Sequence, residues 1–196
     1  FKYITDHIFN TTQADFDPRT GIVYKSPTNA GKSWVYGIEA NIQRKFDFIP
    51  RWGSGFGVNA NFTYSLSRMQ VPGRPKGQAM AEQTPLLYNV SLFYEKYGVN
   101  ARIALNYTGA YLKELNLASV KGIGLLHKDA SFDTYQGENY SLDFQLSYSF
   151  KKHFTVFMEM NNLLDWPYFE YRGQKDRPLR VEYYRQRGQV GFKYEL

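Results

Sequence analysis

The sequence has no cysteine among its 196 residues, and it has no apolar run long enough to form a transmembrane helix. Without cysteine there is no disulfide scaffold, no cysteine-ligated zinc and no thiol catalysis. A helix that crosses a bilayer needs about 20 consecutive apolar residues, whereas the mean hydropathy here is −0.52. The 43% of residues that are hydrophobic must therefore be organised in another way.

Aromatic residues and positive charge are abundant instead. Aromatic side chains make up 18% of the chain, with 17 tyrosines and 15 phenylalanines, and the formal net charge is +6. This aromatic content favours β-strands and is typical of the girdles that flank a membrane-spanning barrel. The excess of lysine and arginine is either scattered surface charge or a surface that meets the phosphates of lipid or of an anionic ligand.

Apolar and polar residues alternate over long stretches, as a β-strand requires, because successive side chains point to opposite faces. Between Leu142 and Phe150 every second residue is apolar, and polar residues such as Asp143 and Gln145 lie between them. Several stretches have roughly the 9–11 residues of a tilted membrane-spanning strand. The alternation predicts about eight strands, at Phe1–Asn10, Ser33–Phe46, Gly55–Ser67, Pro85–Glu95, Val99–Gly109, Asn139–Phe150, His153–Asn162 and Gln189–Leu196.

The connections between these strands alternate between long and short. Short connections are predicted only at 47–54, 96–98 and 151–152, and long polar stretches lie between the other neighbours. Antiparallel membrane barrels have short periplasmic turns and long extracellular loops, whereas a soluble sandwich has no reason to sort its loops in this way. The sequence therefore predicts an all-β fold, an antiparallel transmembrane β-barrel with its C-terminus in the periplasm. Aromatic residues gather at both ends of the strands, Trp52 and Trp166 among them, and we expect their rings at the level of the lipid headgroups.

The polar faces of the predicted strands are rich in Asn, Ser, Thr and Gln and carry one or two charges each. Charged members are Glu39, Arg102, Asp143, Glu159, Lys193 and Glu195. In hydrocarbon every backbone group must be paired, so the barrel must close, either as eight strands or as one arc of a larger barrel. An inner face this hydrophilic predicts a wet lumen, or a lumen that another polar domain fills.

The last third of the chain resembles a known family. Asn161-Asn162-Leu163-Leu164-Asp165, followed by Pro167 and Tyr168, is similar to the Asn-Leu-Phe-Asp-x-x-Tyr region of TonB-dependent outer-membrane receptors. Arg177-Pro178, Glu182-Tyr183-Tyr184, Gly188 and the final strand resemble the closing segment of that family, and Gly37-Ile38-Glu39 and Thr84-Pro85 match its earlier strand starts. Barrels of this kind usually end in Phe or Trp, whereas this chain ends in Leu196.

The resemblance implies a part of a larger molecule. Residues 1–196 would be the C-terminal portion of a 22-stranded barrel in the bacterial outer membrane, with a plugged lumen. The plug domain, the remaining strands and the segment that contacts TonB would lie outside this sequence. Membrane lipid and lipopolysaccharide would surround the wall, and a small-molecule ligand would be captured from outside.

Enzyme chemistry finds little support in the sequence. The three histidines, His7, His127 and His153, have no metal-ligand spacing, so we expect no metal site and no cofactor. Asp143 and Glu159 lie on the polar faces of neighbouring predicted strands and could form a carboxylate pair, but a lumen charge that contacts a plug is the favoured interpretation. Glycines 53, 55 and 57 resemble a phosphate-binding loop, but no helix follows them.

The long connection 165–188 mixes aromatic and cationic residues, which suits the capture of an anionic or aromatic ligand such as an iron-siderophore. The alternative is loop packing with contacts to lipid phosphates. The same composition could bind nucleic acid, but the barrel pattern argues against it. The candidate ligand-binding residues from the loop and the lumen are Arg102, Asn106, Trp166, Tyr168, Tyr171, Arg172, Tyr183, Tyr184 and Arg185.

These observations predict a non-enzymatic outer-membrane receptor that imports a scarce nutrient, an iron-siderophore being the favoured ligand, with energy supplied through TonB. Two other hypotheses are open at this stage. One is a self-contained eight-stranded barrel with a structural or adhesive role. The other is an outer-membrane hydrolase that uses Asp143 and Glu159.

Overall fold

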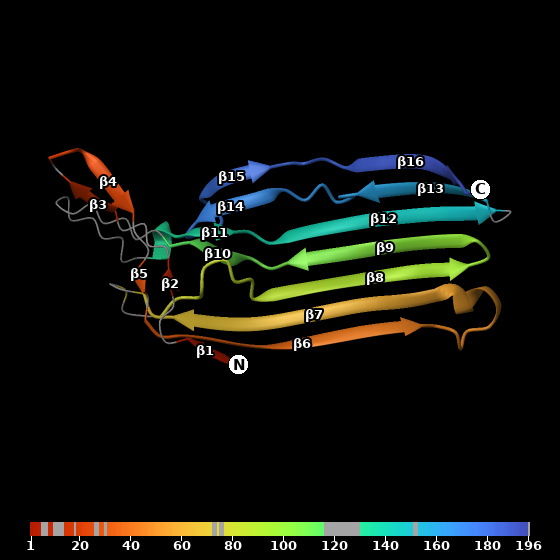
Figure 1. Cartoon of the computed structure of the whole chain (residues 1–196), viewed down its shortest axis with the longest axis horizontal. Helices are drawn as coiled ribbons and strands as arrows, with labels where there is room; N and C mark the ends of the chain where they lie inside the picture. The colour runs from red at the N-terminus through yellow and green to blue at the C-terminus, as the bar shows by residue number, and fades with distance from the viewer. Residues whose placement is uncertain are drawn as a thin grey trace.

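The computed structural model describes residues 1–4, 8–9, 14–17, 19–25, 28–29, 31–71, 74, 77–115, 130–150 and 153–195. Its main feature is one antiparallel sheet of eight strands, of which only β1 is short (Figure 1). In spatial order these are β1 (Lys2–Ile4), β6 (Ser33–Lys45), β7 (Phe56–Met69), β8 (Leu86–Lys96), β9 (Val99–Thr108), β12 (Asn139–Phe150), β13 (Phe154–Asn161) and β16 (Arg187–Tyr194). Each strand of the main sheet pairs with the next main strand along the chain, which is the meander that the alternation of loop lengths predicts.

The predicted strands are confirmed, and no bound shifts by more than two residues, except for the first strand. The prediction of one strand over Phe1–Asn10 is wrong, because β1 covers only Lys2–Ile4 and β2 (Ile8–Phe9) pairs instead with β5 (Thr28–Asn29). The weak alternation in this segment explains the failure. Leu196, the predicted turn 151–152, His7 and His127 lie outside the described residues.

The long connections contain regular structure that the sequence analysis did not predict. Segments 112–138 and 163–188, which were expected to be irregular, contribute a four-stranded antiparallel sheet at the long-loop end. Its strands are β10 (Tyr111–Glu114), β11 (Thr134–Gln136), β14 (Tyr168–Arg172) and β15 (Pro178–Glu182). Two further strands, β3 (Ala14–Asp17) and β4 (Ile22–Lys25), form a hairpin in the expected loop 11–32. Short 3-10 helices are η1 (Arg51–Gly55) and η2 (Ala130–Phe132).

The register of the main sheet keeps all apolar faces on one side. Across β6, β7 and β8, for example, Ile38 lies opposite Tyr64, and Tyr64 lies opposite Leu86. Because a slip of one residue would move a whole strand's apolar set to the other face, this agreement fixes the register over the sheet. The opposite face carries an equally continuous polar row, in which successive partners are Lys45, Gly57, Phe93, Arg102, Gln145, Glu159 and Gln189.

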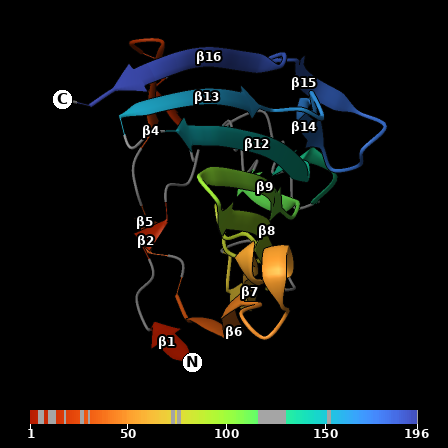
Figure 2. The same ribbon diagram turned by 90° about the vertical axis from the view of Figure 1, so that its right-hand side faces the viewer.

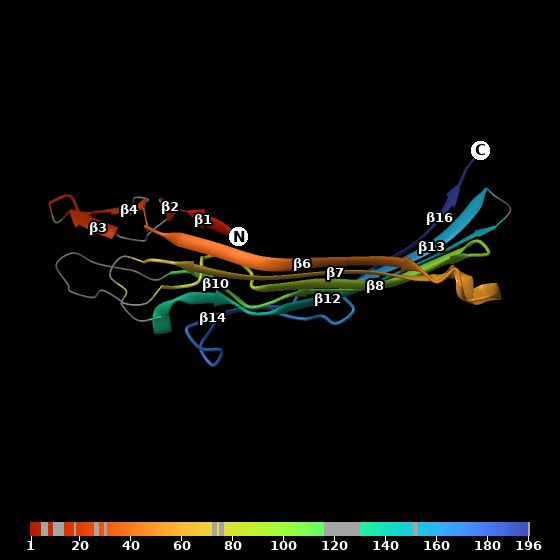
Figure 3. The same cartoon turned by 90° about the horizontal axis from the view of Figure 1, so that it is seen from below.

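The sheet is an open, curved arc (Figures 2 and 3). Large side chains of its apolar face are exposed. Val190 and Phe192 are 74% and 75% exposed, and Phe62 in the middle of β7 is 42% exposed. Among the described residues β16 pairs only with β13, so the eight strands do not close on themselves and form a partial barrel. A soluble sandwich would bury these side chains, and a self-contained eight-stranded barrel would pair this edge.

The buried apolar core lies elsewhere, at the long-loop end. In the described part of the chain the buried hydrophobic residues are Met69, Val71, Leu112, Leu115 and Tyr171. Four of them form one cluster, against which Met80 and Tyr135 pack. None of the helices in the described part is both long and apolar enough to cross a membrane.

Candidate functional site

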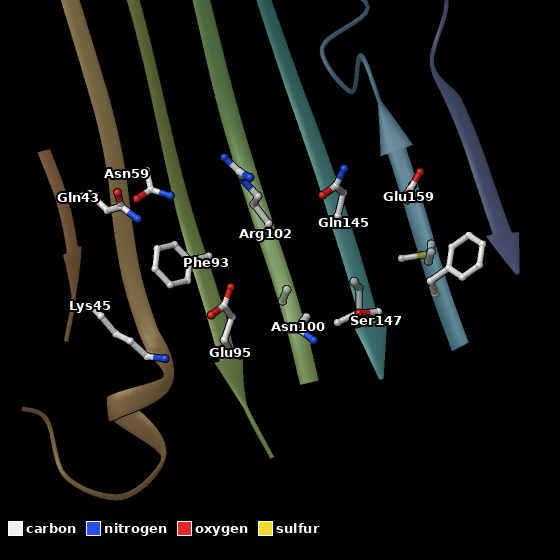
Figure 4. Close-up of a pocket in the computed structure, with 14 residues that line it drawn as sticks. Gln43, Lys45, Asn59, Phe93, Glu95, Asn100, Arg102, Gln145, Ser147 and Glu159 are labelled. Carbon is white, nitrogen blue, oxygen red and sulfur yellow. The ribbon is translucent and has the colours of Figure 1, made fainter. Parts of the chain in front are cut away.

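The polar face of the sheet contains a hollow of about 580 Å³ near the short-turn end. Figure 4 shows its polar side chains side by side on β6 to β13, with Arg102 near the middle. We call this the polar hollow. Its lining residues are Gln43, Lys45, Asn59, Phe93, Glu95, Asn100, Ala101, Arg102, Gln145, Leu146, Ser147, Phe157, Met158 and Glu159.

Two phenylalanine rings in the polar hollow lie over glycines of the neighbouring strand. A Cβ atom at Gly57 would collide with the Phe93 ring, with Cε1 only 2.7 Å away. A Cβ atom at Gly191 would lie 2.5 Å from Cζ of Phe157. The absence of a side chain at each glycine therefore lets a ring lie flat on the sheet, which adds apolar surface to an otherwise hydrophilic wall.

The charges of the polar hollow have no ionic partner among the residues that the structure describes. Lys45, Glu95, Arg102 and Glu159 form no ion pair with any described residue. Arg102 Nη2 donates a hydrogen bond to Ser91 Oγ at 3.2 Å. The side-chain amide of Gln189 in β16 donates one to the Glu159 carboxylate at 2.5 Å. Charges of both signs on a concave wall suit a partner surface that carries complementary charges.

A second hollow, of about 450 Å³, lies at the long-loop end and brings together four predicted ligand-binding residues. Trp166, Tyr168, Tyr184 and Arg185, which we call the rim cluster, line it together with Asn139, Tyr140, Ser141, Asn161, Asn162 and Arg187. Trp166 packs edge-on against Tyr140 with centroids 4.7 Å apart, and its Nε1 donates to the Glu138 carbonyl at 2.9 Å. Because Tyr140 belongs to the apolar face, Trp166 lies on the outer side of the wall.

The other predicted ligand-binding residues lie apart from the rim cluster. Tyr183 and Arg172 are exposed and line neither hollow, and Asn106 lies on the polar face between Asn89 and Ser141. Tyr171 is only 8% exposed, because it stacks on Tyr135 at 5.4 Å between centroids. Arg102 alone lines the polar hollow.

An ion-pair network fixes Tyr168 in the four-stranded sheet. Lys113 Nζ hydrogen-bonds to the Glu170 carboxylate and to the Tyr168 hydroxyl, and that hydroxyl donates to the same carboxylate. Burial alone would raise the pKa of Glu170, but the hydrogen bonds from Lys113 and Tyr168 hold it below its ordinary value. The hydrogen bond to Glu170 in turn raises the pKa of Lys113. Arg180 lies over the Tyr168 ring, 5.2 Å from its centroid.

The segment Asn161–Asp165, which carries the family resemblance, is held by a network of hydrogen bonds. The Asn162 side chain donates to the Arg185 carbonyl at 3.0 Å, and the Asp165 carboxylate accepts from the Arg185 amide at 2.9 Å. Asn162 and Asp165 both adopt positive φ, of 57° and 44°. The Asp143 carboxylate accepts from the Asn162 amide at 2.9 Å. These side chains therefore hold the approach to β16 and position Arg185.

In this geometry Asp143 holds the backbone of Asn162, and Asp143 and Glu159 do not form the carboxylate pair that the hydrolase hypothesis requires. Asp143 accepts hydrogen bonds from Ser141 and Asn162, whereas Glu159 lies opposite Gln145 and bonds to Gln189. No group of three or more histidine, aspartate or glutamate side chains in the described part of the chain could hold a metal ion.

The sequence analysis missed several residues that line hollows. Gln43, Phe93 and Phe157 share the face of Arg102, so strand parity is the sequence signal that could have identified them. A third hollow, of about 310 Å³, is lined by Gln83, Tyr111, Tyr135 and eight further residues besides Tyr171. It depends on contacts between distant connections, which leave no local signal in the sequence.

A family model described as TonB dependent receptor-like, beta-barrel, matches residues 2–163. The chain therefore belongs to the TonB-dependent receptor family, which is a family of receptors and not of enzymes. Among curated protein sequences none matches significantly.

Three solved structures share the fold. The ferric yersiniabactin uptake receptor FyuA from Yersinia pestis is 18% identical, with a TM-score of 0.57 over 86% of this chain and 24% of that chain. The copper transporter OprC is 13% identical, with a TM-score of 0.58 over 98% of this chain and 27% of that chain. The siderophore receptor PirA from Acinetobacter baumannii is 14% identical, with a TM-score of 0.57 over 98% and 27%. This chain thus spans about a quarter of the length of these proteins.

Proposed function

We propose that this member of the TonB-dependent receptor family is the C-terminal part of an outer-membrane transport receptor that imports a small molecule with energy supplied through TonB. The observation that carries the proposal is the unbroken register of the main sheet, which leaves an exposed apolar face on one side and a polar face with unpaired charges on the other. An apolar face suits lipid, including lipopolysaccharide in the outer leaflet, and a polar face suits a lumen. The short-turn end and the C-terminus are then periplasmic.

We propose that the polar hollow receives the plug domain. Glu95, Arg102 and Glu159 have no ionic partner within the described chain, and Phe93 offers an apolar contact between them. A charge that becomes enclosed in the lumen without a partner would be costly, so a lumen-filling domain should supply opposite charges at these positions. Residues 1–196 contribute wall and loops in this arrangement, and the contact with TonB lies outside them.

For the transported ligand we propose an iron-siderophore, captured at the long-loop end by the rim cluster. Two of the three similar structures are named as siderophore or ferric-siderophore receptors, and the third is named as a copper transporter, which makes a copper complex the competing ligand. Arg185 offers a cation to an anionic chelate, because its side chain is 82% exposed, although it lies 3.6 Å from the Asp165 carboxylate, which also holds its backbone amide.

The test uses the full-length receptor in a strain that lacks its own copy, with growth and uptake measured on ferric siderophores and on copper as the probes. We expect Arg185→Ala to weaken binding of the imported chelate to whole cells, because an exposed cation is lost. Arg102→Ala should leave binding intact and reduce uptake, because it faces the plug. Arg19→Ala is the matched control, since this arginine is 89% exposed at the β3–β4 hairpin.

The outcomes separate the parts of the proposal. Copper-dependent uptake without siderophore uptake would replace the ligand and keep the receptor. A receptor absent from the outer-membrane fraction, or cells whose uptake of every probe is unchanged by its deletion, would overturn the transport function.

A further inference from the structure

The wall is split between β12 and β13 at the long-loop end. The ladder between these strands ends at the pair Phe144 and Met160, although β12 continues beyond it to Asn139. Pairing resumes only at Gln136 and Glu170, in the four-stranded sheet. Figure 1 shows the kinked connection between β13 and β14 beside this part of β12. The start of β12 therefore has no partner strand on this side.

Contacts from the kinked connection bridge the split in place of a ladder. The Leu163 amide donates to the Leu142 carbonyl at 2.8 Å. The Trp166 indole donates to the Glu138 carbonyl, so a side chain occupies a place at which a neighbouring strand would bind. The hollow of about 450 Å³ that the rim cluster lines lies in this split, and we call it the rim hollow. Because these contacts hold its edges, the rim hollow is a fixed feature of the wall.

The rim hollow is lined from both faces of the wall. Tyr140 belongs to the apolar face, and Trp166 packs against its ring. Ser141, Asn161 and Arg187 belong to the polar face, because they share the strand parity of its polar row. One hollow therefore joins aromatic rings on the lipid side of the sheet to polar groups on the other side.

The polar part of the rim hollow is positively charged. Arg185 and Arg187 line it, and no acidic side chain is among its lining residues. Arg187 forms no ion pair with any residue that the structure describes, whereas Arg185 lies 3.6 Å from the Asp165 carboxylate. Asparagine side chains of the lining add neutral hydrogen-bond donors. This part therefore suits an anionic group, which binds guanidinium through charge-assisted hydrogen bonds.

The aromatic part of the rim hollow continues along the outer face of the wall. Tyr88, Tyr107 and Tyr140 are cross-strand partners on three adjacent strands, with centroids 4.6 Å and 4.7 Å apart. Together with Trp166 they form a row of rings that ends at the hollow. An acyl chain that leaves the hollow on this side can lie along the rings and bury its methylene groups.

We propose that the rim hollow binds an amphiphilic anion, namely an acylated form of the imported iron chelate. The anionic, iron-binding head lies against Arg185 and Arg187, and the acyl tail leaves over Tyr140 and Trp166. The inference rests on the proposed import of an iron-siderophore and names its chemical class. A head group without a tail would leave the aromatic half of the hollow unfilled, so the two-sided lining distinguishes acylated chelates from tailless ones.

The experiment compares iron chelates with and without a tail. The probes are a ferric tris-catecholate and a ferric citrate chelate, both anionic, each with and without one dodecanoyl chain. Dissociation constants are measured with radioactive iron on cells that carry the full-length receptor, after subtraction of the binding to cells without it. We expect the tail to tighten binding of the preferred chelate by about tenfold or more, since burial of about two methylene groups suffices for this factor.

Two kinds of variant separate the tail from the head. Trp166→Ala should weaken the acylated chelate by about tenfold more than the tailless one, and Tyr140→Ala, which removes the second outer ring, should act in the same direction. Arg187→Ala should weaken both forms by about tenfold or more. Trp34→Ala is the matched control, because Trp34 stacks on Tyr36 on the same face and at the same end of the wall but does not line the rim hollow. Unheated mobility in detergent gels confirms that each variant is folded.

The outcomes distinguish this inference from the function on which it rests. Equal binding of the two forms, or a tail effect that Trp166→Ala and Trp34→Ala change alike, overturns the acylated ligand and keeps the import of an iron-siderophore. Binding of neither form above that of cells without the receptor overturns the iron-siderophore itself. Lipid phosphate that copurifies with the receptor and is lost in Arg187→Ala, without any benefit of a tail, assigns the rim hollow to an anionic lipid and also overturns the acylated chelate.

Discussion

Replacing Asp133 by asparagine should loosen the long-loop end of the chain while the wall of the barrel stays intact. Asp133 forms a two-pronged ion pair with Arg74, with Nη1–Oδ2 and Nη2–Oδ1 distances of 2.5 Å. Both side chains are buried, with exposures of 0% and 1%. The Asp133 carbonyl also accepts from the Gly173 amide at 2.8 Å. One residue thus joins the β7–β8 connection, η2 and the β14–β15 turn.

The magnitude follows from burial. Removing one partner of a buried ion pair costs about 3–5 kcal/mol, because the other charge stays in a medium of low polarity. Within the described residues Arg74 Nε has no hydrogen-bond acceptor, so it offers no contact that could compensate for the loss of the Asp133 carboxylate. At about 1.4 kcal/mol for each factor of ten, local opening should become on the order of a hundredfold to a few thousandfold more frequent.

Hydrogen exchange on the full-length receptor in detergent measures this opening. We expect faster exchange in peptides that cover 77–84, 130–136 and 168–173, and unchanged exchange in β8 and β9. Glu138→Gln is the control, because its ion-pair partner Lys175 is 58% exposed and the pair should contribute much less than a fully buried one. Unchanged protection at the long-loop end would refute the reasoning from burial, and loss of protection throughout the wall would refute its confinement to that end.

Three other changes test the wall and the loops. Gly191→Val should lower the free energy of unfolding in urea by about 1–3 kcal/mol, because the new side chain meets the Phe157 ring, and adding Phe157→Ala should recover part of the loss. Asn162→Ala should cost about 1–3 kcal/mol in the same assay, because the Arg185 carbonyl loses its donor and alanine tolerates the positive φ at this position less well than asparagine does. The pKa of Glu170 is lowered in the folded protein, so the stability that its ionised carboxylate contributes is present above the ordinary pKa of 4.5 and is lost as the pH falls through the lowered value. Hydrogen exchange in β14 should therefore accelerate in that acidic range. A rate of exchange that does not change with pH, after correction for the intrinsic rate, would contradict the ion pair.

The wall was predictable because its physics is local. In β12, Leu142 and Tyr148 face lipid while Asp143 and Gln145 face the other way, and period-two alternation alone reveals this. The prediction that the strands cross a membrane rested on the alternation of long and short connections. This alternation is a property of the whole chain, but it can be seen without knowledge of contacts. The prediction of the first strand failed after Ile4, because the alternation in the segment Phe1–Asn10 is weak.

The candidate site was only partly predictable, because it is built from contacts between distant segments. Composition drew attention to the connection that carries the rim cluster, but it could not show that Tyr171 is buried against Tyr135. Arg74 and Asp133 are 59 residues apart in sequence and have no pattern in common. Strand parity placed Asp143 among the charges of the lumen, whereas its hydrogen bond from the Asn162 amide becomes visible only when the chain folds back.

The distribution of packing separates two mechanical roles within the chain. In the wall, side chains of the apolar face such as Ile38 and Val190 have no protein neighbours to bury them, so stability there rests on the hydrogen-bonded ladder and on lipid. At the long-loop end, Met69 and Leu112 form a small core beside the Arg74–Asp133 pair, as a soluble domain would. A barrel wall needs no such core to span a membrane. Rigid packing at this end therefore argues that the connections hold fixed positions, which a surface that discriminates between ligands requires.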